Sequence, residues 1–329
     1  MLDLTTSNAA EYLSSRWGYD RSSLSIESLG GGVSNTVLLV EARENRFIVK
    51  QSLGKLRVEQ DWFADRERIF RESEAIRALA PHLPVGSVPD ILFEDRENCL
   101  YAMTAAPRGA QTWKSLLMQG QIDLRTVETV ARMQGVMISV SMADAGLARK
   151  FSDQTVFDQL RLDPYYRFTA SRHPDLSTAF ESLIEYCSRE RLSLVHGDWS
   201  PKNFLVGDES VMAIDFEVIH FGDPAFDTAF ILNHMALKSL CLPERASDFR
   251  AAAEHYWRTL TRELPVNLRE FEARTVRHLG GLLLARVDGK SPVEYVSEEP
   301  MRQRIRAVAR SLILDPPESL MDSIMRVTS

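Results

Sequence analysis

Cysteine is scarce in this sequence of 329 residues. Its three cysteines, Cys99, Cys187 and Cys241, are far apart, odd in number and outside any C-x-x-C pair. This pattern argues against a scaffold held by disulfides and against a structural zinc site, and it favours a protein of a reducing compartment.

Long hydrophobic runs are missing as well. The most apolar stretch, 279–284, is followed by Arg286 and Asp288 and is far too short to cross a bilayer. The first six residues have neither the basic start nor the apolar run of a signal peptide. We therefore expect a cytoplasmic protein without a membrane partner.

The sequence has no excess of positive charge. Its 39 Lys and Arg against 46 Asp and Glu give a formal net charge of −7. An acidic chain is a poor general binder of phosphate backbones, so we predict no nucleic-acid partner. What is present is ample core material: 44% of the residues are hydrophobic and 26% are charged, which argues against disorder.

Two parts of the chain differ in their hydrophobic pattern. In the first part we expect one helix, at 57–79, and strands at 24–29, 36–40, 47–49, 91–93 and 99–103. In the second part we expect short strands at 192–195 and 211–214, and helices at 124–137, 176–186 and through most of 224–325.

These patterns predict an α+β protein with two lobes. The N-lobe, 1–103, would be a small antiparallel sheet, and the C-lobe, 104–329, would be larger and mainly helical. A cleft between two such lobes is a usual place for a ligand.

The strongest candidate site lies at the ends of the two short strands of the second part. H-G-D-W-S-P-K-N occupies 196–203, and I-D-F-E occupies 214–217. If those strands pair, Asp198, Asn203 and Asp215 converge on one point. Their oxygen atoms suit Mg²⁺, which takes one or two protein carboxylates together with water and phosphates. One carboxylate could remain available to accept a proton from an alcohol, as in kinases.

Each of these residues also has a purely structural interpretation. Asp198 and Asn203 could form turn hydrogen bonds, and Asp215 could cap a strand. The joint pattern, with an asparagine five residues after the aspartate and a second acid on an apolar strand, favours the functional interpretation.

A glycine-rich segment in the first part fits the same chemistry. Gly30, Gly31 and Gly32 precede Ser34 and Asn35 between two expected strands. Glycines allow main-chain N–H groups to approach phosphate oxygens closely. The spacing is not G-x-G-x-x-G, and a hairpin turn is the alternative.

Lys50 follows the apolar strand at 47–49 and is a candidate partner for nucleotide phosphates. Its alternative is an ordinary exposed lysine at a strand end. Glu72 in the next helix could hold Lys50 in an ion pair, and Glu74 competes with it. We favour Glu72 because Ile76 follows at a helical interval.

Together these motifs resemble the aminoglycoside phosphotransferase and choline kinase superfamily, relatives of the protein kinases, from about Leu29 to about Leu240. The resemblance implies a two-lobed kinase-like fold. It also implies ATP- and Mg²⁺-dependent transfer of a γ-phosphate to a hydroxyl of a small molecule of aminoglycoside, amino-alcohol or sugar type. The residues V-K-Q at 49–51 and L-R at 56–57 are similar to those of methylthioribose kinases.

The resemblance implies roles for particular residues. Asp198 would be the catalytic base, and Asn203 and Asp215 would ligate Mg²⁺. Lys50 would meet the α- and β-phosphates, and Glu72 would orient it.

Further roles follow from the same resemblance. The main chain of 101–105 would form the hinge that reads the adenine, with Met103 and Ala105 as contacts. Glu217 would help to bind a second metal or a cationic substrate, with a solvated strand-end glutamate as the alternative. Asp227 would brace the catalytic loop by hydrogen bonds.

Substrate selectivity is expected where the chain resembles the family least. One such segment is 161–167 and another is 286–290. Trp199 could stack on a ligand, whereas Tyr165 and Tyr166 are more simply explained as packed core aromatics. Arg286 and Lys290 could contact an anionic substrate or form a charged surface turn.

Two other functions agree less well with the sequence. Only residues 216–221 separate Asp215 from Gly222, which leaves no room for the long activation segment of a protein kinase. A catalytically silent nucleotide-binding regulator would have lost Asp198, a metal ligand or Lys50, and none is lost. The acceptor, the choice between ATP and GTP, the number of metal ions and the oligomeric state stay open.

Overall fold

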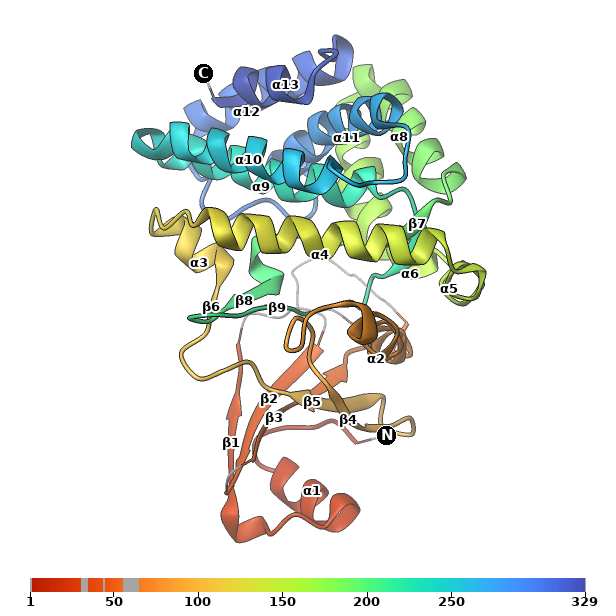
Figure 1. Cartoon of the computed structure of the whole chain (residues 1–329), viewed down its shortest axis with the longest axis vertical. Helices are drawn as coiled ribbons and strands as arrows, with labels where there is room; N and C mark the ends of the chain where they lie inside the picture. The colour runs from red at the N-terminus through yellow and green to blue at the C-terminus, as the bar shows by residue number, and fades with distance from the viewer. Residues whose placement is uncertain (1, 31–34, 44, 56–64, 329) are drawn as a thin grey trace. The chain divides into compact units, whose positions relative to one another are not determined.

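A computed structural model describes residues 2–30, 35–43, 45–55 and 65–328 (Figure 1). Its internal contacts divide the chain into two compact units. The N-terminal unit comprises Met1–Ala110 and Met212–Glu217, and the C-terminal unit comprises Gln111–Val211 and Val218–Ser329. The N-terminal unit thus continues past residue 103, and the I-D-F-E segment returns to it.

The N-terminal unit is built on a five-stranded antiparallel sheet with the strand order β1-β2-β3-β5-β4. All five predicted strands form, with slightly different ends. Their bounds are β1 Leu24–Ser28, β2 Asn35–Ala42, β3 Asn45–Ser52, β4 Ile91–Asp95 and β5 Leu100–Thr104. On β2 and β3 successive residues are buried on opposite faces, so both faces of the sheet must be covered.

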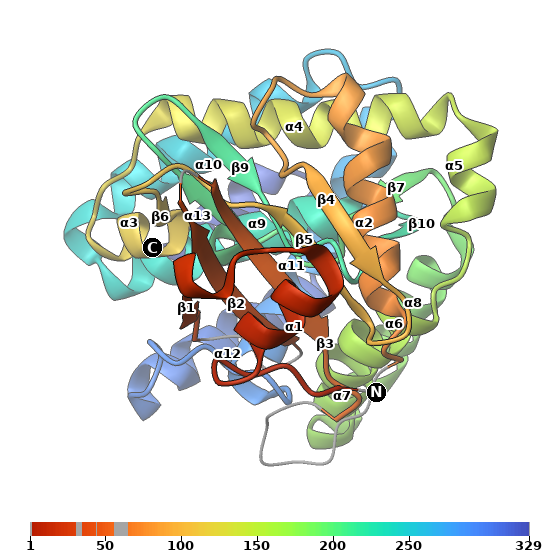
Figure 2. The same ribbon diagram turned by 90° about the horizontal axis from the view of Figure 1, so that it is seen from below.

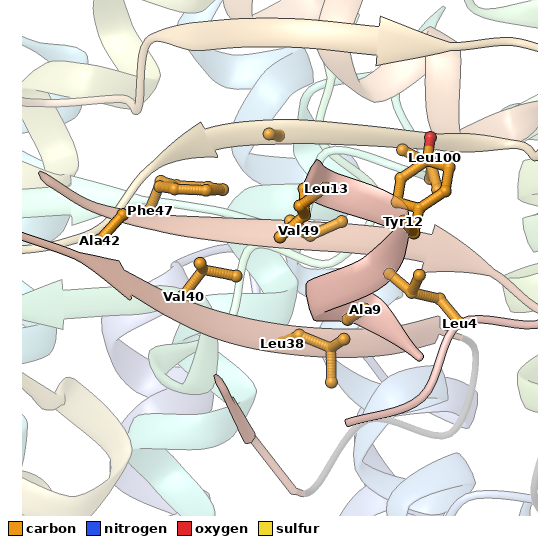
Figure 3. Close-up of a cluster of buried hydrophobic side chains, with 11 residues drawn as sticks. Leu4, Ala9, Tyr12, Leu13, Leu38, Val40, Ala42, Phe47, Val49 and Leu100 are labelled. Carbon is orange, nitrogen blue, oxygen red and sulfur yellow. The ribbon is translucent and has the colours of Figure 1, made fainter. Parts of the chain in front are cut away.

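Helix α1, Ala9–Trp17, covers one face of this sheet (Figure 2) and is absent from the predicted elements. Tyr12 and Leu13 of α1 pack in one cluster with Leu38, Val40, Phe47, Val49 and Leu100 (Figure 3). Trp17 stacks on Phe93 of β4, with the ring centroids 4.0 Å apart.

Helix α2, Arg68–Leu79, packs on the other face. Its Ile69 and Phe70 contact the side chains of alternate strand residues such as Ile48 and Tyr101. The predicted helix was to begin at Arg57. Residues 56–64 lie outside the described part, and 65–67 are not helical. The carboxylate of Asp65 accepts a hydrogen bond from the N–H of Glu67 (2.9 Å), a turn that precedes the helix.

The C-terminal unit is mainly helical, as predicted. Its described helices are α3 Trp113–Met118, α4 Leu124–Met142, α5 Ala145–Lys150, α6 Thr155–Phe157, α7 Phe168–Arg172, α8 Ser177–Arg189, α9 Ala225–Cys241, α10 Ala246–Thr261, α11 Leu268–Asp288, α12 Glu299–Leu314 and α13 Leu320–Thr328. A π-helical segment, Asp158–Arg167, joins α6 to α7. Helix α9 is buried along nearly its whole length and packs against α10 and α11, so it forms the centre of this unit (Figure 1).

Short strands position the loops that follow β5. They are β6 Gln111–Thr112, β7 Ser193–Val195, β8 Phe204–Val206, β9 Val211–Ala213 and β10 His220–Gly222. Met212 and Ala213 of β9 belong to the N-terminal unit, and the other four strands belong to the C-terminal unit. Strand β7 pairs antiparallel with β10, whereas β6 pairs with β8. The condition set for convergence, that the strands at 192–195 and 211–214 pair with each other, is therefore not met. Residues 214–219, which follow β9, form no strand and include a turn. The next strand, β10, is the partner of β7.

Two expectations from the sequence concern membrane-spanning helices and disulfide bonds. Across the described ranges, no helix combines the length and the apolar composition needed to cross a membrane. The thiols of Cys99, Cys187 and Cys241 are free, and the first two are buried.

Candidate active site

The loop after β7 carries the H-G-D motif in a conformation that requires glycine. Gly197 has φ +77°, and a Cβ atom there would lie 2.7 Å from Cγ1 of Val218. The N–H of Asp198 donates to Nδ1 of His196 (3.2 Å), which is itself fully buried. His196 is thus a buried residue that is hydrogen-bonded within this loop.

Asp198 is 3% exposed and is bound by two cations. Oδ2 of Asp198 lies 2.8 Å from Nζ of Lys202 and 3.0 Å from a terminal nitrogen of Arg161. Burial by itself would raise the pKa of Asp198, but Lys202 and Arg161 together hold it well below the usual value. The carboxylate is therefore ionised throughout the physiological pH range.

Arg161 reaches this carboxylate from the π-helical segment. Its Nε donates to the carbonyl of Gly197 (2.5 Å), and another nitrogen donates to the carbonyl of Leu160 (2.6 Å). The sequence placed Arg161 in a segment for substrate selectivity, and the structure places it on Asp198. The role of Lys202 was missed, although its position four residues after Asp198 in the motif was a usable signal.

Asp227 makes the hydrogen bonds predicted for it. Its two carboxylate oxygens accept from the N–H of His196 (2.6 Å) and the N–H of Gly197 (2.9 Å). Burial raises the pKa of Asp227 to about 7. This residue, at the start of α9, ties the loop to the centre of the C-terminal unit.

Trp199 does not offer its ring to a ligand. It is 1% exposed, its Nε1 donates to the hydroxyl of Tyr256 (2.9 Å), and its ring packs against Phe204. The stacking role is therefore wrong. Tyr165 and Tyr166 are buried, as the packing interpretation predicts.

Asn203 is held within the same loop. Its Nδ2 donates to the carbonyl of Asp198 (2.9 Å). Because the amide nitrogen is engaged, Oδ1 is the atom of Asn203 that suits a metal ion. Asp198 and Asn203 both belong to the C-terminal unit.

The N-terminal unit holds the predicted lysine and its acidic partners. Nζ of Lys50 lies 2.7 Å from Glu72 and 2.6 Å from Asp215. Lys50 is buried on the central strand β3, so the exposed strand-end alternative is wrong. Burial alone would lower the pKa of Lys50, but Asp215 and Glu72 raise it above the usual value. Glu74 instead lies 3.8 Å from Arg96.

Asp215 adopts an unusual backbone conformation. Its φ is +69°, a region that residues with a Cβ atom visit rarely. The next N–H, of Phe216, donates to Glu72 (3.1 Å), so α2 and the I-D-F-E segment are joined at this point. Backbone strain of this kind is common where a functional side chain must be aimed.

Glu217 is 5% exposed, so the solvated alternative is wrong. Its Oε2 accepts from Nδ2 of Asn35 (2.9 Å) and from Nε of Arg68 (3.1 Å). Arg68 in turn donates to the carbonyl of Asp65 (2.6 Å) at the start of α2. Sequence reasoning missed Arg68 because nothing in its local context distinguishes it from a surface arginine.

The predicted glycine segment is described only in part. A Cβ atom added at Gly30 would meet no heavy atom of the described residues within 4 Å, whereas Gly31, Gly32 and Ser34 lie outside those residues. Asn35 is the first residue of β2, and its amide is directed to Glu217.

The predicted hinge lies mostly inside the sheet. Met103 of β5 is opposite Ile48 on β3 and opposite Ile91 on β4, so its strand is paired on both sides. Ala105 is the first residue after the strand, and its N–H approaches the carbonyl of Arg46 (3.4 Å). The connecting segment therefore begins later than predicted.

Each of the two units carries oxygen donors of a kind that suits a divalent metal ion. Asp215 and Glu217 bring two carboxylates within the N-terminal unit, and Asn203 brings an amide oxygen in the C-terminal unit. Oxygen ligands of this kind are those that Mg²⁺ and Ca²⁺ prefer. The donor chemistry therefore fits the cation that the resemblance implies.

Comparison with known proteins identifies the family. The model of the phosphotransferase enzyme family matches residues 25–271, which is most of the chain. The chain belongs to this family, and the predicted resemblance is confirmed.

Two curated relatives of similar sequence are small-molecule kinases. Methylthioribose kinase 2 of Oryza sativa subsp. japonica is 24% identical over 260 residues, or 70% of this chain and 60% of the relative. Methylthioribose kinase of Escherichia coli is 23% identical over 264 residues, or 70% of this chain and 62% of the relative. The predicted similarity to methylthioribose kinases is confirmed, and the chain spans about three fifths of the length of these relatives.

Solved structures share the fold over nearly the whole chain. A choline/ethanolamine kinase family protein from Mesorhizobium loti has a TM-score of 0.59 at 16% identity, covering 99% of both chains. An amicoumacin kinase has a TM-score of 0.58 at 14% identity, covering 98% of this chain and 97% of the other. The predicted α+β, kinase-like fold class is confirmed.

Proposed function

We propose that this protein transfers the γ-phosphate of ATP to a hydroxyl of a small molecule, with Mg²⁺ as the metal cofactor. The observation that carries the proposal is the state of Asp198, a nearly buried carboxylate held ionised by Lys202 and Arg161 within the H-G-D motif. A buried, ionised carboxylate of this kind can accept the proton that an attacking alcohol must lose.

Asp198 is the proposed catalytic base. It accepts the hydrogen bond of the acceptor hydroxyl, and it takes the proton as the oxygen–phosphorus bond forms. A strongly basic carboxylate is not required, because phosphoryl transfer depends mainly on placement and on neutralisation of charge. Lys202 and Arg161 act as positioning residues that hold the carboxylate in one orientation.

Nucleotide binding is assigned to the N-terminal unit. Lys50, oriented by Glu72, would bind the phosphates of ATP, since it is a buried cation whose partners are both acids of the same unit. The main chain of Gly30, Gly31 and Gly32, with Ser34 and Asn35, would cover the phosphates.

The adenine is assigned to the residues at the end of β5. Met103 and Ala105 are the proposed contacts, with Ala105 at the point where the chain leaves the strand. Relatives in fold are known with nucleotides: the amicoumacin kinase structure contains AMP-PNP and Ca²⁺, and a spectinomycin phosphotransferase structure contains ADP.

Asn203, Asp215 and Glu217 are the proposed metal ligands. When bound, Mg²⁺ would neutralise the charge of the phosphates during transfer. Asp215 also contacts Lys50, so one side chain links the lysine to the metal position. Glu217 is held by Arg68, which fixes its orientation before any metal binds.

The test is a screen of ADP release over amino-alcohols, sugars, nucleoside-derived thiosugars and aminoglycosides. We expect Asp198→Asn to lower kcat by about 10²- to 10⁴-fold, the usual contribution of a general base, with ATP affinity nearly unchanged. Asp208→Asn is the matched control, because Asp208 is an exposed aspartate of the same unit, and its activity should equal that of the wild type.

Near-normal turnover by Asp198→Asn would remove Asp198 from the role of base. Binding of ATP without phosphate transfer to any compound of the panel would contradict the proposed activity and favour a silent nucleotide-binding regulator.

A further inference from the structure

Two cations are buried in the C-terminal unit without a carboxylate partner. Lys238, near the end of α9, is 0% exposed, and Arg286, near the end of α11, is 9% exposed. Within the described ranges, no carboxylate lies within ion-pair distance of either side chain. Buried charges are usually paired, because an unpaired charge in a protein interior is strongly unfavourable.

The polar contact of Lys238 is a phenol. Its Nζ donates to the hydroxyl of Tyr295 (3.3 Å) and lies 4.8 Å from the centre of that ring. Burial, reinforced by the nearby cations Lys114 and Arg286, lowers the pKa of Lys238 to about 7. The protein therefore holds this ammonium group where its charge is poorly stabilised.

Arg286 is also bound by neutral groups. One terminal nitrogen donates to the hydroxyl of Tyr165 (2.8 Å) and to the carbonyl of Ser291 (2.5 Å). Its Nε is buried and has no hydrogen-bond partner among the described residues. At least one strong donor of this guanidinium is thus unused.

A third cation lies at the exposed side of this group. Lys114 of α3 forms an ion pair with Glu294, whose side chain is 67% exposed. Glu294 precedes Tyr295, so the ion pair marks where the cluster approaches solvent. We call Lys114, Lys238 and Arg286 the cationic cluster. In the part of the chain that the structure describes, Glu294 is the carboxylate paired with it.

The cationic cluster is connected to Asp198 through aromatic residues. Arg161, which binds Asp198, lies over the rings of Tyr165 (5.7 Å) and Phe230 (6.0 Å). The Tyr165 hydroxyl is the one that accepts from Arg286. Arg161 and Arg286 therefore both contact the side chain of Tyr165, Arg161 through the ring and Arg286 through the ring and the hydroxyl.

Helix α9 makes a second connection. Phe230 packs against His234 (5.4 Å between centroids), and His234 lies 3.4 Å from the Tyr295 hydroxyl that Lys238 also contacts. Burial, with Lys238 and Arg286, holds the pKa of His234 well below its usual value, so this ring is neutral.

We propose that the cationic cluster binds an anionic group of the acceptor, a carboxylate or a phosphate, while the acceptor hydroxyl meets Asp198. The assignment of the hydroxyl rests on the proposed function, whereas the anion site rests on the cluster itself. An anion would give Lys238 and the free donor of Arg286 charge-assisted hydrogen bonds that they otherwise lack.

The same charges define which acceptors are excluded. A polycationic acceptor would place its ammonium groups beside Lys238 and Arg286, and like charges at close range are repulsive in a poorly solvated site. We therefore expect hydroxy acids or phosphorylated alcohols in preference to aminoglycosides or choline-like compounds.

Lys290 provides the matched control. It was grouped with Arg286 as a possible anion contact, but its Nζ lies 2.7 Å from Asp163, so it has a carboxylate partner. Lys290→Met removes one positive charge from the same region, as Lys238→Met does, and leaves the cationic cluster intact.

The first experiment measures anion binding without nucleotide or turnover. Calorimetric titrations and thermal unfolding are run with inorganic phosphate, and separately with malonate, in chloride-free buffer. We expect Lys238→Met to weaken binding of the preferred anion by about tenfold to a hundredfold, the range for a lost charged hydrogen bond. Wild type and Lys290→Met should bind alike. Arg286→Lys, which keeps the charge but loses the fork of donors, should weaken binding less than Lys238→Met.

Equal anion affinity in wild type and Lys238→Met would overturn the proposal. Loss of the phosphate effect in Lys290→Met to the same extent would also overturn it, because the effect would then reflect net charge alone. The comparison of phosphate with malonate identifies which anionic group the cluster accepts.

The second experiment measures acceptor choice by ADP release. Pairs of compounds are used that differ only in charge: a hydroxy acid with its amide, and a sugar phosphate with its free sugar. We expect the anionic member to have the lower KM in the wild type, and Lys238→Met to raise that KM about tenfold or more with little change in kcat. Equal KM values within each pair would contradict the proposal.

The two proposals can fail separately. If anion binding depends on Lys238 but no compound supports ADP release, the anion site stands and the proposed kinase activity fails. If ADP is released with neutral acceptors only, the kinase activity stands and the anion site fails as a substrate site.

Discussion

Asp198 shows how far a local motif can identify a candidate catalytic residue. Its position in H-G-D and the asparagine five residues later identified it from sequence, because these residues lie in one short loop. Arg161 contacts the same carboxylate oxygen of Asp198 as Lys202 does, and it comes from a distant segment of the chain. Only folding brings that guanidinium to Asp198, so no local pattern could reveal it.

The lowered pKa of Lys238 predicts how stability depends on pH. The folded pKa is about 7 and that of the unfolded chain is near the ordinary 10.5, so between these values the unfolded state binds more protons. The free energy of unfolding should therefore rise with pH above about 7. Below that pH both states carry the charge, and the folded state bears the full unfavourable burial. Denaturant unfolding at pH 7 and pH 8.5 measures the effect.

Lys238→Met should abolish this rise, and Lys290→Met should retain it. The comparison isolates one lysine from the other charged or titratable groups around it, which are Lys114, His234, Cys241, Arg286, Glu294 and Tyr295. The raised pKa of Asp227 does not interfere, because a raised carboxyl pKa affects stability below pH 7. A rise of the same size in Lys238→Met would show that another group is responsible.

At the scale of elements, the sequence predicted the strands of the sheet better than it predicted where helices lie and begin. The alternation at 24–29 identified β1, whereas β2 and β3 were identified from short apolar runs at 36–40 and 47–49, where both faces of the sheet are covered. Helix α1 was missed because its stability comes from packing on that sheet, through Tyr12 and Leu13, and its own sequence pattern does not indicate a helix. The partner of β7 could not be read from sequence, because the choice between β9 and β10 depends on the path of the loops.

Docking of α1 can be tested with one substitution. Leu13 is 0% exposed in the cluster beneath α1, and Leu13→Ala should lower the free energy of unfolding by about 2–5 kcal/mol, the usual effect of a buried leucine. Leu124→Ala is the control, because Leu124 begins α4 and is 45% exposed, and it should change stability by less than about 0.5 kcal/mol. A loss in Leu13→Ala as small as the one expected for Leu124→Ala would mean that α1 does not contribute to the core.

At the scale of the whole molecule, the proposed chemistry is divided between the two units. Lys50, Glu72 and Asp215 are joined within the N-terminal unit, and Asp198, Lys202 and the cationic cluster lie in the C-terminal unit. Nucleotide binding and acceptor activation should therefore be separable by substitution.

Lys50→Met tests that division. We expect about tenfold or greater loss of ATP affinity, because a charged hydrogen bond to phosphate is removed, whereas Asp198→Asn should bind ATP as the wild type does. A fluorescent ATP analogue measures the affinity, after circular dichroism has established that the variant is folded. Lys55→Met is the control, since Lys55 is an exposed lysine close to the same strand. Unchanged ATP affinity in Lys50→Met would refute the assignment of the phosphates to this lysine.

Short motifs carried the resemblance to the family and its fold class, which the comparisons confirm, and they named the proposed site residues that lie within them. The chain carries such motifs whether or not it is folded. Folding was needed to reveal that Glu217 is held by Arg68, that Arg161 binds Asp198, and that Lys238 and Arg286 are buried without an ion-pair partner among the described residues. Each of these depends on which distant side chains share a desolvated space, and burial is what gives such charges their energetic weight.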